Sequence, residues 1–333
     1  MGTVYITQAE SFIGKTDERL QVKADKNIVL DVPLLKIDGV VVLGRATISP
    51  ALIAELLERK IPLTFMTETG KYLGKLEPEF TKNIFVRDAQ WNAKGETTKA
   101  VHVVQGFVRG KLKNYRRNIQ QIQRDWTELN LDSAIARIND AIASVNKTHN
   151  IDSLRGLEGA GSAAYFGIFN QLIRVDGFAF KPRHRPATDR VNSLLNFGYT
   201  LLRHDVQSAL NIVGFDPYLG YLHLQRYGRP SLAFDLMEEF RPLVVDAMIL
   251  NAINRRLLTL NDFTTEPLSN VVKLTETGCR EFLRMYAQKK QTKFTHPVLG
   301  RKCTYQEAFE LQARLLAKFL MGEIEKYTPL VMK

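Results

Sequence analysis

The chain has 333 residues, of which 45% are hydrophobic and 24% charged, so it is neither a disordered chain nor a small disulfide-rich domain. No run of eighteen apolar residues is present, which argues against a transmembrane helix, and the first residues lack the basic and apolar regions of a signal peptide. The two cysteines, Cys279 and Cys303, lack metal-binding spacing. We therefore expect a cytoplasmic protein of about two domains.

The net charge is +11, and it is unevenly distributed along the chain. Residues 1–85 contain 11 basic and 11 acidic side chains, whereas residues 86–333 contain 35 and 24. A basic excess that is confined to one region favours a polyanionic partner there. Simple solubility is the alternative explanation.

Residues 1–85 predict a small β-rich domain. The continuous apolar run Val40–Leu43 is typical of a strand buried on both faces, and Ser49 followed by Pro50 is typical of a helix start. The other elements expected here are strands at 4–6, 20–22, 28–32 and 63–66, a helix end near Lys60, and a strand after the turn at 70–74. Because this region is neutral and holds no cluster of catalytic residue types, we expect it to form a dimerisation domain.

The remainder of the chain predicts helices. Residues 86–105 are expected to form a linker or an irregular strand, and residues 106–333 show mostly helical periodicity. Loops are expected at 144–152, 176–189, 215–229 and 262–271. The predicted fold class is α+β with two domains, a small β-rich N-terminal domain and a larger, mainly α-helical C-terminal catalytic domain.

The helix that begins at Pro230 contains the clearest local pattern. Asp235, Glu238 and Glu239 lie within one arc of this helix, among leucines. Carboxylates in apolar surroundings are costly unless a cation, a metal or a donor meets them. Pro242 removes a hydrogen bond to the carbonyl of Glu238 and should kink the helix at these acids. A solvated acidic face is the alternative.

His223 lies twelve residues before Asp235, and the loop after it contains Arg226, Tyr227 and Arg229. Arginine and tyrosine together can bind phosphate and stack on a base. A histidine that simply satisfies its hydrogen bonds in the core is the alternative.

Glu158 lies among small residues in the segment 156–164, which allows another backbone to come close. An ordinary glutamate in the first turn of a helix is the alternative. No spacing rule connects Glu158 with His223 or Glu238.

Three basic stretches lie in the helical region. Their members are Arg109, Lys111, Lys113, Arg116, Arg117 and Arg124; Lys181, Arg183, His184, Arg185 and Arg190; and Lys289, Lys290, Lys293, Arg301 and Lys302. Together they favour a nucleic-acid backbone as partner, although each could be a solvated face. The sequence contains no Walker loop, Rossmann glycine pattern, nucleophile elbow or HExxH motif, which disfavours nucleotide-binding and zinc-protease functions.

Four segments carry a family resemblance, at residues 157–166, 190–199, 214–223 and 229–242. In their order and spacing the chain resembles the Cas-one family, the CRISPR-associated integrases. The resemblance extends over essentially the whole chain. It is more specific in these four segments than in the N-terminal segment 48–52.

The resemblance implies a metal-dependent DNA endonuclease and integrase, which inserts new spacer DNA into a CRISPR array by attack of a 3′-hydroxyl on a phosphodiester. It places the metal ligands at Glu158, His223 and Glu238, with Asp235 as a supporting catalytic acid. Whether Glu239 also reaches the ion is left open. Two carboxylates and one imidazole suit Mg²⁺ or Mn²⁺.

The resemblance also implies double-stranded DNA as partner, both incoming spacer DNA and the CRISPR repeat, with no membrane association. It implies a homodimer joined through the N-terminal domains and a small Cas-two dimer, with a Cas-four nuclease as a further candidate partner. The candidate DNA-binding residues are Arg116, Arg117, Arg183, Arg185, Arg190, Arg226 and Arg229. Two alternatives stay open, a stand-alone structure-specific nuclease in DNA repair and a non-catalytic DNA-binding scaffold.

Overall fold

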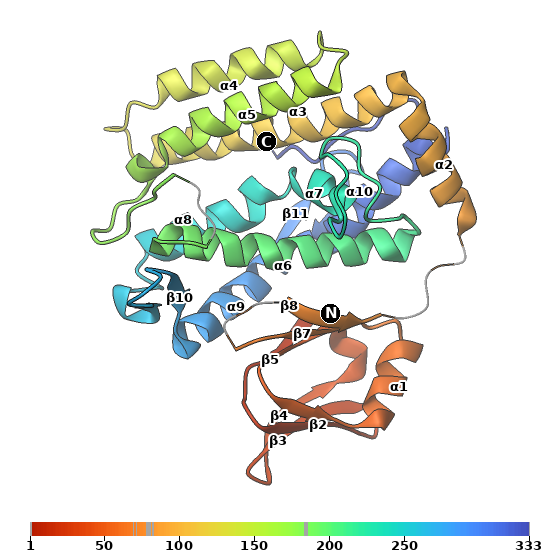
Figure 1. Ribbon diagram of the computed structural model, residues 1–333, viewed down its shortest axis with the longest axis vertical. Coiled ribbons are helices and arrows are strands. Elements are labelled where there is room, and N and C mark those ends of the chain that lie inside the picture. Colours follow the sequence, from red (N-terminus) through yellow and green to blue (C-terminus); the bar gives the residue numbers. More distant parts are fainter. Residues whose placement is uncertain are drawn as a thin grey trace. The chain divides into compact units, whose positions relative to one another are not determined.

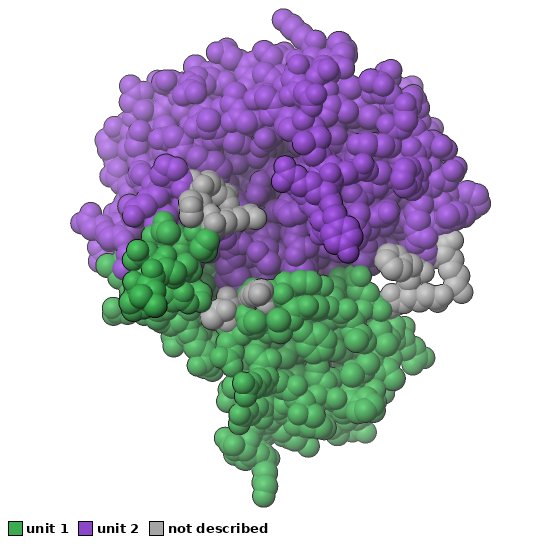
Figure 2. All heavy atoms as spheres, in the orientation of Figure 1, with its two compact units in different colours: residues 1–80, 186–188, 258–288 green, residues 81–185, 189–257, 289–333 purple. Residues whose placement is uncertain are grey.

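The computed structural model describes residues 2–68, 70, 72–77, 81, 83–182 and 186–332. The chain divides into two compact units, which are coloured separately in Figure 2. The N-terminal unit comprises residues 1–80, 186–188 and 258–288, and the helical unit comprises residues 81–185, 189–257 and 289–333. Within the described ranges, no helix is long and apolar enough to cross a membrane.

The N-terminal unit is built from two four-stranded sheets that share one apolar core (Figure 1). The first sheet has the order β1 (Gly2–Ile6), β5 (Ile37–Leu43), β7 (Leu63–Met66), β8 (Tyr72–Leu76), in which only the last pair is antiparallel. The second has the order β4 (Asn27–Pro33), β3 (Arg19–Ala24), β2 (Ser11–Thr16), β6 (Ala46–Ile48). Leu52 and Leu56 of helix α1 (Pro50–Glu58) complete the core.

Local sequence patterns predicted several of these elements correctly. Val40–Leu43 is buried throughout, as expected for an inner strand. Helix α1 begins after Ser49, whose hydroxyl accepts a hydrogen bond from the Leu52 amide, and it ends at Glu58. Strand β2 was not predicted, because Gly14 and three polar side chains interrupt its apolar alternation.

Residues 258–288 belong to the N-terminal unit, although the sequence analysis assigned them to the helical domain. They form the turn η4 (Leu260–Asp262), the hairpin of β9 (Phe263–Thr265) and β10 (Val272–Leu274), and most of helix α9 (Glu276–Lys290). The Val272 amide donates to the Ala187 carbonyl within this unit. Such pairings join segments far apart in the chain, so local patterns could not predict them.

The helical unit contains helices α2 (Ile84–Gly95), α3 (Thr97–Asp125), α4 (Asp132–Val145), α5 (Ile151–Gly167), α6 (Arg190–Val213), α7 (Ser231–Met237), α8 (Ala247–Asn254) and α10 (Tyr305–Leu320). It also contains the 3₁₀ turn η2 (Phe169–Leu172), the π-helix η3 (Arg241–Asp246), the end of α9, and the hairpin of β11 (Lys293–Thr295) and β12 (Lys302–Thr304). Helices α3, α4 and α5 pack against one another (Figure 1).

The predicted linker at residues 86–105 is wrong, because α2 and the start of α3 occupy this segment. Its buried positions include Val101, Val103 and Val104, and β-branched residues favour strands in isolation. Packing of these valines in the interior of the helical unit overrides that preference.

Candidate functional site

Helix α5 carries Glu158 and packs against α3. The helix begins after Asn150, whose side chain accepts a hydrogen bond from the Ser153 amide. A Cβ atom at Gly161 would lie only 2.1 Å from the Leu112 side chain of α3, so a larger residue there would force Leu112 to move. Of the glycines around Glu158, Gly161 thus faces a side chain of α3, whereas a Cβ atom at Gly156 or Gly159 would meet nothing within 4 Å.

Asp235, on helix α7, organises the loop that carries His223. Its fully buried carboxylate accepts hydrogen bonds from the backbone amides of Tyr221 (2.6 Å), Leu222 (2.9 Å) and His223 (2.9 Å). A Cβ atom at Gly220 would lie 2.8 Å from the same carboxylate, so glycine is needed there. One buried charge thus fixes three successive loop amides.

The imidazole of His223 lies between two carboxylates. Its Nδ1 is 2.7 Å from Asp235 Oδ1, and its Nε2 is 3.9 Å from Glu238 Oε1. A proton on Nδ1, held by Asp235, leaves the lone pair of Nε2 facing Glu238. Asp235 therefore orients His223.

The junction between α7 and η3 positions Glu238. As predicted, the α-helix is interrupted at the acids: it ends at Met237 and continues as a π-helix that contains Pro242. Two amides of α3 satisfy backbone carbonyls at this break. The Asn114 side chain donates to the Glu239 carbonyl (2.9 Å), and Asn118 donates to the Pro242 carbonyl (2.7 Å).

Two cations meet the Glu238 carboxylate, whose side chain is only 1% exposed. Arg241 Nη1 donates to Oε1 at 2.6 Å, and Lys111 Nζ lies 2.6 Å from Oε2. Burial raises the pKa of the Glu238 carboxyl, but Arg241 and Lys111 lower it more strongly, to about 2. Lys111 also donates to Glu158 Oε1, which in turn accepts from Ser162 at 3.0 Å.

Glu239 points to a different part of the unit from Glu238. Its carboxylate accepts hydrogen bonds from the Tyr327 hydroxyl, from Gln312 Nε2 (2.8 Å) and from the Leu330 amide (2.7 Å). Burial raises the pKa of this carboxyl to about 8. Glu239 thus anchors the C-terminal segment, and its carboxylate takes no part in the cluster around Glu238.

The structure brings Glu158, His223 and Glu238 to one place, although 80 residues separate the first from the last. In the described part of the chain, no three His, Cys, Asp or Glu side chains could hold one metal ion as they stand. The positively charged Lys111 ammonium lies between the carboxylates of Glu158 and Glu238 and contacts both.

The donor set nevertheless fits a hard divalent cation. It offers two carboxylates and an imidazole nitrogen whose ring is oriented by Asp235. The buried Glu238 Oε2 forms an ion pair with Lys111 and has no other polar partner among the described residues. This oxygen could bind a metal ion if the ammonium moved away.

A sequence profile of the family described as CRISPR associated protein Cas1, the Cas-one family named above, matches residues 4–288. The chain belongs to the Cas1 family.

Two curated relatives illustrate the Cas1 family membership. "CRISPR-associated endonuclease Cas1 3" of Thermus thermophilus is 35% identical over 336 residues, covering 100% of this chain and 98% of that protein. A "CRISPR-associated exonuclease Cas4/endonuclease Cas1 fusion" of Geobacter sulfurreducens is 29% identical, covering 97% of this chain and 59% of the fusion.

Solved structures share the Cas1 fold. A "casposase bound to integration product" superposes with a TM-score of 0.84 at 23% identity, covering 98% of this chain and 93% of that one. A chain of a "Cas6-RT-Cas1–Cas2 complex" gives a TM-score of 0.80 at 23% identity, covering 99% of this chain and 36% of that one. These likenesses support the α+β fold with its β-rich start and helical remainder.

The predicted DNA-binding arginines of this Cas1 chain lie in different surroundings. Arg226 is exposed on the loop after His223, and the Arg229 guanidinium lies 5.2 Å from the Phe234 ring, which in turn is 5.7 Å from the His223 ring. These two arginines therefore belong to the neighbourhood of the site.

The other arginines are more scattered. Arg116 donates to Asn139 of α4, and Arg117 is close enough to Lys289 to lower its pKa, so the two face different neighbours. Arg190 donates to the Gly177 carbonyl at 3.3 Å. Arg183 and Arg185 lie outside the described residues.

Two residues of the cluster, Lys111 and Arg241, were not predicted as part of the site. Lys111 was grouped with the basic stretch of α3, although it shares a buried helical face with Asn114 and Asn118. That spacing of buried polar residues could have identified it. Arg241 lies three residues after Glu238, which is the spacing of a helical ion pair.

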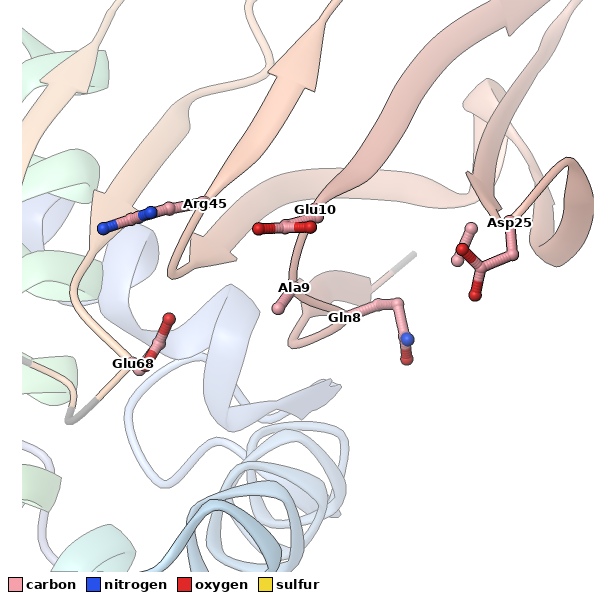
Figure 3. A pocket seen from close by; sticks show the side chains of 7 residues that line it. Gln8, Ala9, Glu10, Asp25, Arg45 and Glu68 are labelled. Atoms are coloured by element: carbon pink, nitrogen blue, oxygen red, sulfur yellow. The ribbon is translucent and has the colours of Figure 1, made fainter.

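The N-terminal unit of this Cas1 chain has a polar pocket of its own. It is lined by Gln8, Ala9, Glu10, Ala24, Asp25, Arg45 and Glu68 (Figure 3). Three of these side chains are acidic and one is basic, and this lining includes no histidine or cysteine. The pocket thus lacks the imidazole–carboxylate combination found around Glu238.

Proposed function

We propose that this protein is a metal-dependent DNA endonuclease and integrase of CRISPR adaptation, which joins the 3′-hydroxyl of spacer DNA to a phosphodiester of the CRISPR array. The observation that carries the proposal is that the Lys111 ammonium bridges Glu158 and Glu238, while His223, bound to Asp235, faces Glu238. Cas1 family membership and the curated relatives named as endonucleases support it.

In this mechanism Glu158, Glu238 and His223 Nε2 would hold Mg²⁺ or Mn²⁺, and the ion would supply charge stabilisation for the attacking and leaving oxygens of the phosphodiester. Asp235 holds the proton of His223 on Nδ1, so that Nε2 keeps its lone pair. Arg241 keeps Glu238 ionised and in place.

The loop after His223 supplies cations for the DNA backbone. Arg226 is exposed, and Arg229 lies over Phe234 at the edge of the site. Two backbone contacts from α2 and α5 support this loop, because Lys94 donates to the Gly220 carbonyl (2.8 Å) and Arg155 to the Leu222 carbonyl (3.0 Å). Phosphate contacts from a loop held in this way orient the duplex without reading its sequence.

The test is His223→Ala, measured with Mn²⁺ on a nicking assay and on a strand-transfer assay with a 3′-hydroxyl DNA end. We expect a loss of both activities by at least about 10²-fold with an unchanged circular dichroism spectrum. His149→Ala, a histidine on the loop before α5, is the matched control and should keep both activities.

The two alternatives predict different outcomes for the wild-type protein. Metal-dependent cleavage of branched DNA without strand transfer would favour a stand-alone repair nuclease. DNA binding without metal-dependent cleavage, unaffected by His223→Ala, would favour a non-catalytic scaffold.

We also propose assembly as a homodimer through the N-terminal unit, with a small Cas2 dimer and a Cas4 nuclease as further partners. The likeness to a chain of a Cas6-RT-Cas1–Cas2 complex and to a Cas4/Cas1 fusion supports the latter two. For the homodimer, Ile28 and Val29 on the edge strand β4 are 54% and 52% exposed. Exposed apolar side chains on a sheet edge are a natural pairing surface.

The double variant Ile28→Lys with Val29→Lys tests the homodimer by light scattering. We expect the mass to fall to that of a monomer at micromolar concentration. The control Lys60→Glu, on the turn after α1, should stay dimeric, and a double variant that dimerises like the wild type would contradict the proposal.

A further inference from the structure

Lys111 stands apart from the other basic residues of α3. Its side chain is 3% exposed, whereas Lys113 and Arg116 in the same stretch are only partly buried. A buried ammonium is strongly disfavoured unless carboxylates compensate it. Lys111 has two such partners, Glu158 Oε1 and Glu238 Oε2, which come from different helical segments.

A metal ion shared by Glu158 and Glu238 would have to lie between their carboxylates, where the Lys111 ammonium lies. Both carboxylates that the proposed function assigns to the metal are the ones that Lys111 contacts. His223 Nε2, the third proposed ligand, faces the same Glu238 carboxylate at 3.9 Å. A divalent cation and an ammonium cannot share this position, because like charges at contact distance repel strongly.

We propose that Lys111 is an internal placeholder for the metal, whose ammonium neutralises Glu158 and Glu238 in the metal-free protein and leaves when the divalent ion binds. This inference rests on the proposed function. Without Lys111, Glu158 and Glu238 would lose the ammonium that bridges them, and among the described lysines and arginines that contact Glu238, Arg241 would remain. Lysine suits an exchange of this kind, because it is a point charge on a flexible stem and makes no bidentate clamp.

Two consequences follow from a placeholder. The metal-free protein is stabilised, because its buried carboxylates have a counter-ion. The affinity for metal is lowered, because the ion must displace that counter-ion and gains only the difference between the two interactions. A lysine that merely positioned the ligands for the metal would do the opposite and raise the affinity.

The decisive experiment compares the full-length wild type with Lys111→Met by calorimetric titration with Mn²⁺ and by thermal unfolding with and without Mn²⁺. We expect Lys111→Met to bind Mn²⁺ at least about tenfold more tightly. Its melting temperature should be lower than that of the wild type without metal and should rise more when Mn²⁺ is added. Equal or weaker Mn²⁺ binding by Lys111→Met would overturn the inference.

Lys113→Met is the matched control, because it removes the same charge two positions along α3, where the neighbouring charges are Arg109 and Arg116. It should bind Mn²⁺ like the wild type. An equal gain in affinity in Lys113→Met would show a general charge effect and would also overturn the placeholder.

Lys111→Arg provides a second variant that keeps the buried charge, in case Lys111→Met does not fold. A guanidinium can bridge two carboxylates with several bonds and leaves less readily, so Mn²⁺ should bind at least about tenfold more weakly than to the wild type. Wild-type affinity in this variant would count against the exchange.

The titrations also separate the two proposals. If the wild type binds Mn²⁺ and His223→Ala weakens that binding while Lys111→Met does not strengthen it, only the placeholder fails. If neither the wild type nor Lys111→Met binds Mn²⁺, the metal site itself is wrong and both proposals fall.

Discussion

The two compact units of this protein differ in where their charged side chains lie. In the N-terminal unit, ion pairs such as Arg19–Asp31 lie at the surface, with side chains 43% and 35% exposed. Among the described residues, every buried aspartate, glutamate and histidine belongs to the helical unit: Asp189, His204, Asp235, Glu238, Glu239, Asp246 and His296. Buried charges are costly unless they are paired, so their concentration in one unit supports placing the proposed site there.

The difference between the units is sharpest at Asp235, where we expect the largest effect on stability. Each oxygen of the Asp235 carboxylate accepts two hydrogen bonds. Asp235→Asn replaces one of these oxygens by an NH₂ group, which cannot accept them, so two donors lose their acceptor. The substitution should lower the free energy of unfolding by about 3 kcal/mol in urea denaturation.

Asp31→Asn in the N-terminal unit is the matched control for Asp235→Asn. Because its ion pair with Arg19 is exposed, the loss should stay below about 1 kcal/mol. Equal losses in the two variants would contradict the contrast between the units.

Close packing of α3 against α5 should be sensitive to a single methyl group. Gly161→Ala forces Leu112 to move and should cost about 1–3 kcal/mol of stability in thermal unfolding. At Gly159, two residues earlier, a Cβ atom meets nothing within 4 Å, so Gly159→Ala should stabilise the helix by up to about 1 kcal/mol. Destabilisation of both variants alike would mean that the two helices are not in close contact at Gly161.

The salt dependence of DNA binding should differ between variants of the two units. Replacing Arg226 and Arg229 with alanine should weaken binding to duplexes of any sequence. The slope of log affinity against log salt should flatten by roughly 0.9 for each phosphate that the variant no longer neutralises. Arg19→Ala, in the N-terminal unit, which has no basic excess, is the control and should leave the slope unchanged. An unaltered slope in the double variant would show that these arginines are merely solvated.

The smallest expected effect concerns pH. Burial, with a contribution from Arg117, lowers the pKa of Lys289 to about 8 from its ordinary value of 10.5. Because the folded protein disfavours the charged lysine, this residue reduces stability below pH 8, and that penalty disappears between pH 8 and 10.5. Lys289→Met should therefore stabilise the protein at pH 7 by on the order of 1 kcal/mol. Thermal unfolding across this pH range checks the change, and a wild-type pH profile in the variant would contradict it.

Sequence patterns by themselves determined the features that depend on neighbouring residues. Ser49 and Pro50 start α1, Val40–Leu43 forms a buried strand, and Pro242 interrupts the helix beside the acids. These features arise from side-chain caps, apolar runs and a missing backbone donor, all of which act within a few residues. The motifs around Glu158, His223 and Glu238 also sufficed for the family, which the profile match confirms.

Only the tertiary structure decided how residues distant in sequence share the interior. Lys111 lies in a basic stretch that predicts a solvated or DNA-binding face, yet the approach of α5 and η3 buries it between two carboxylates. Glu238 and Glu239 are adjacent acids, but the interrupted helix directs one to the cluster and the other to the C-terminal segment. Residues 86–105 are helical for the same reason, because their buried valines pack in the interior. Local preferences are worth tenths of a kcal/mol per residue, whereas burial of an apolar side chain or pairing of a charge is worth about 1–3 kcal/mol, so packing decides.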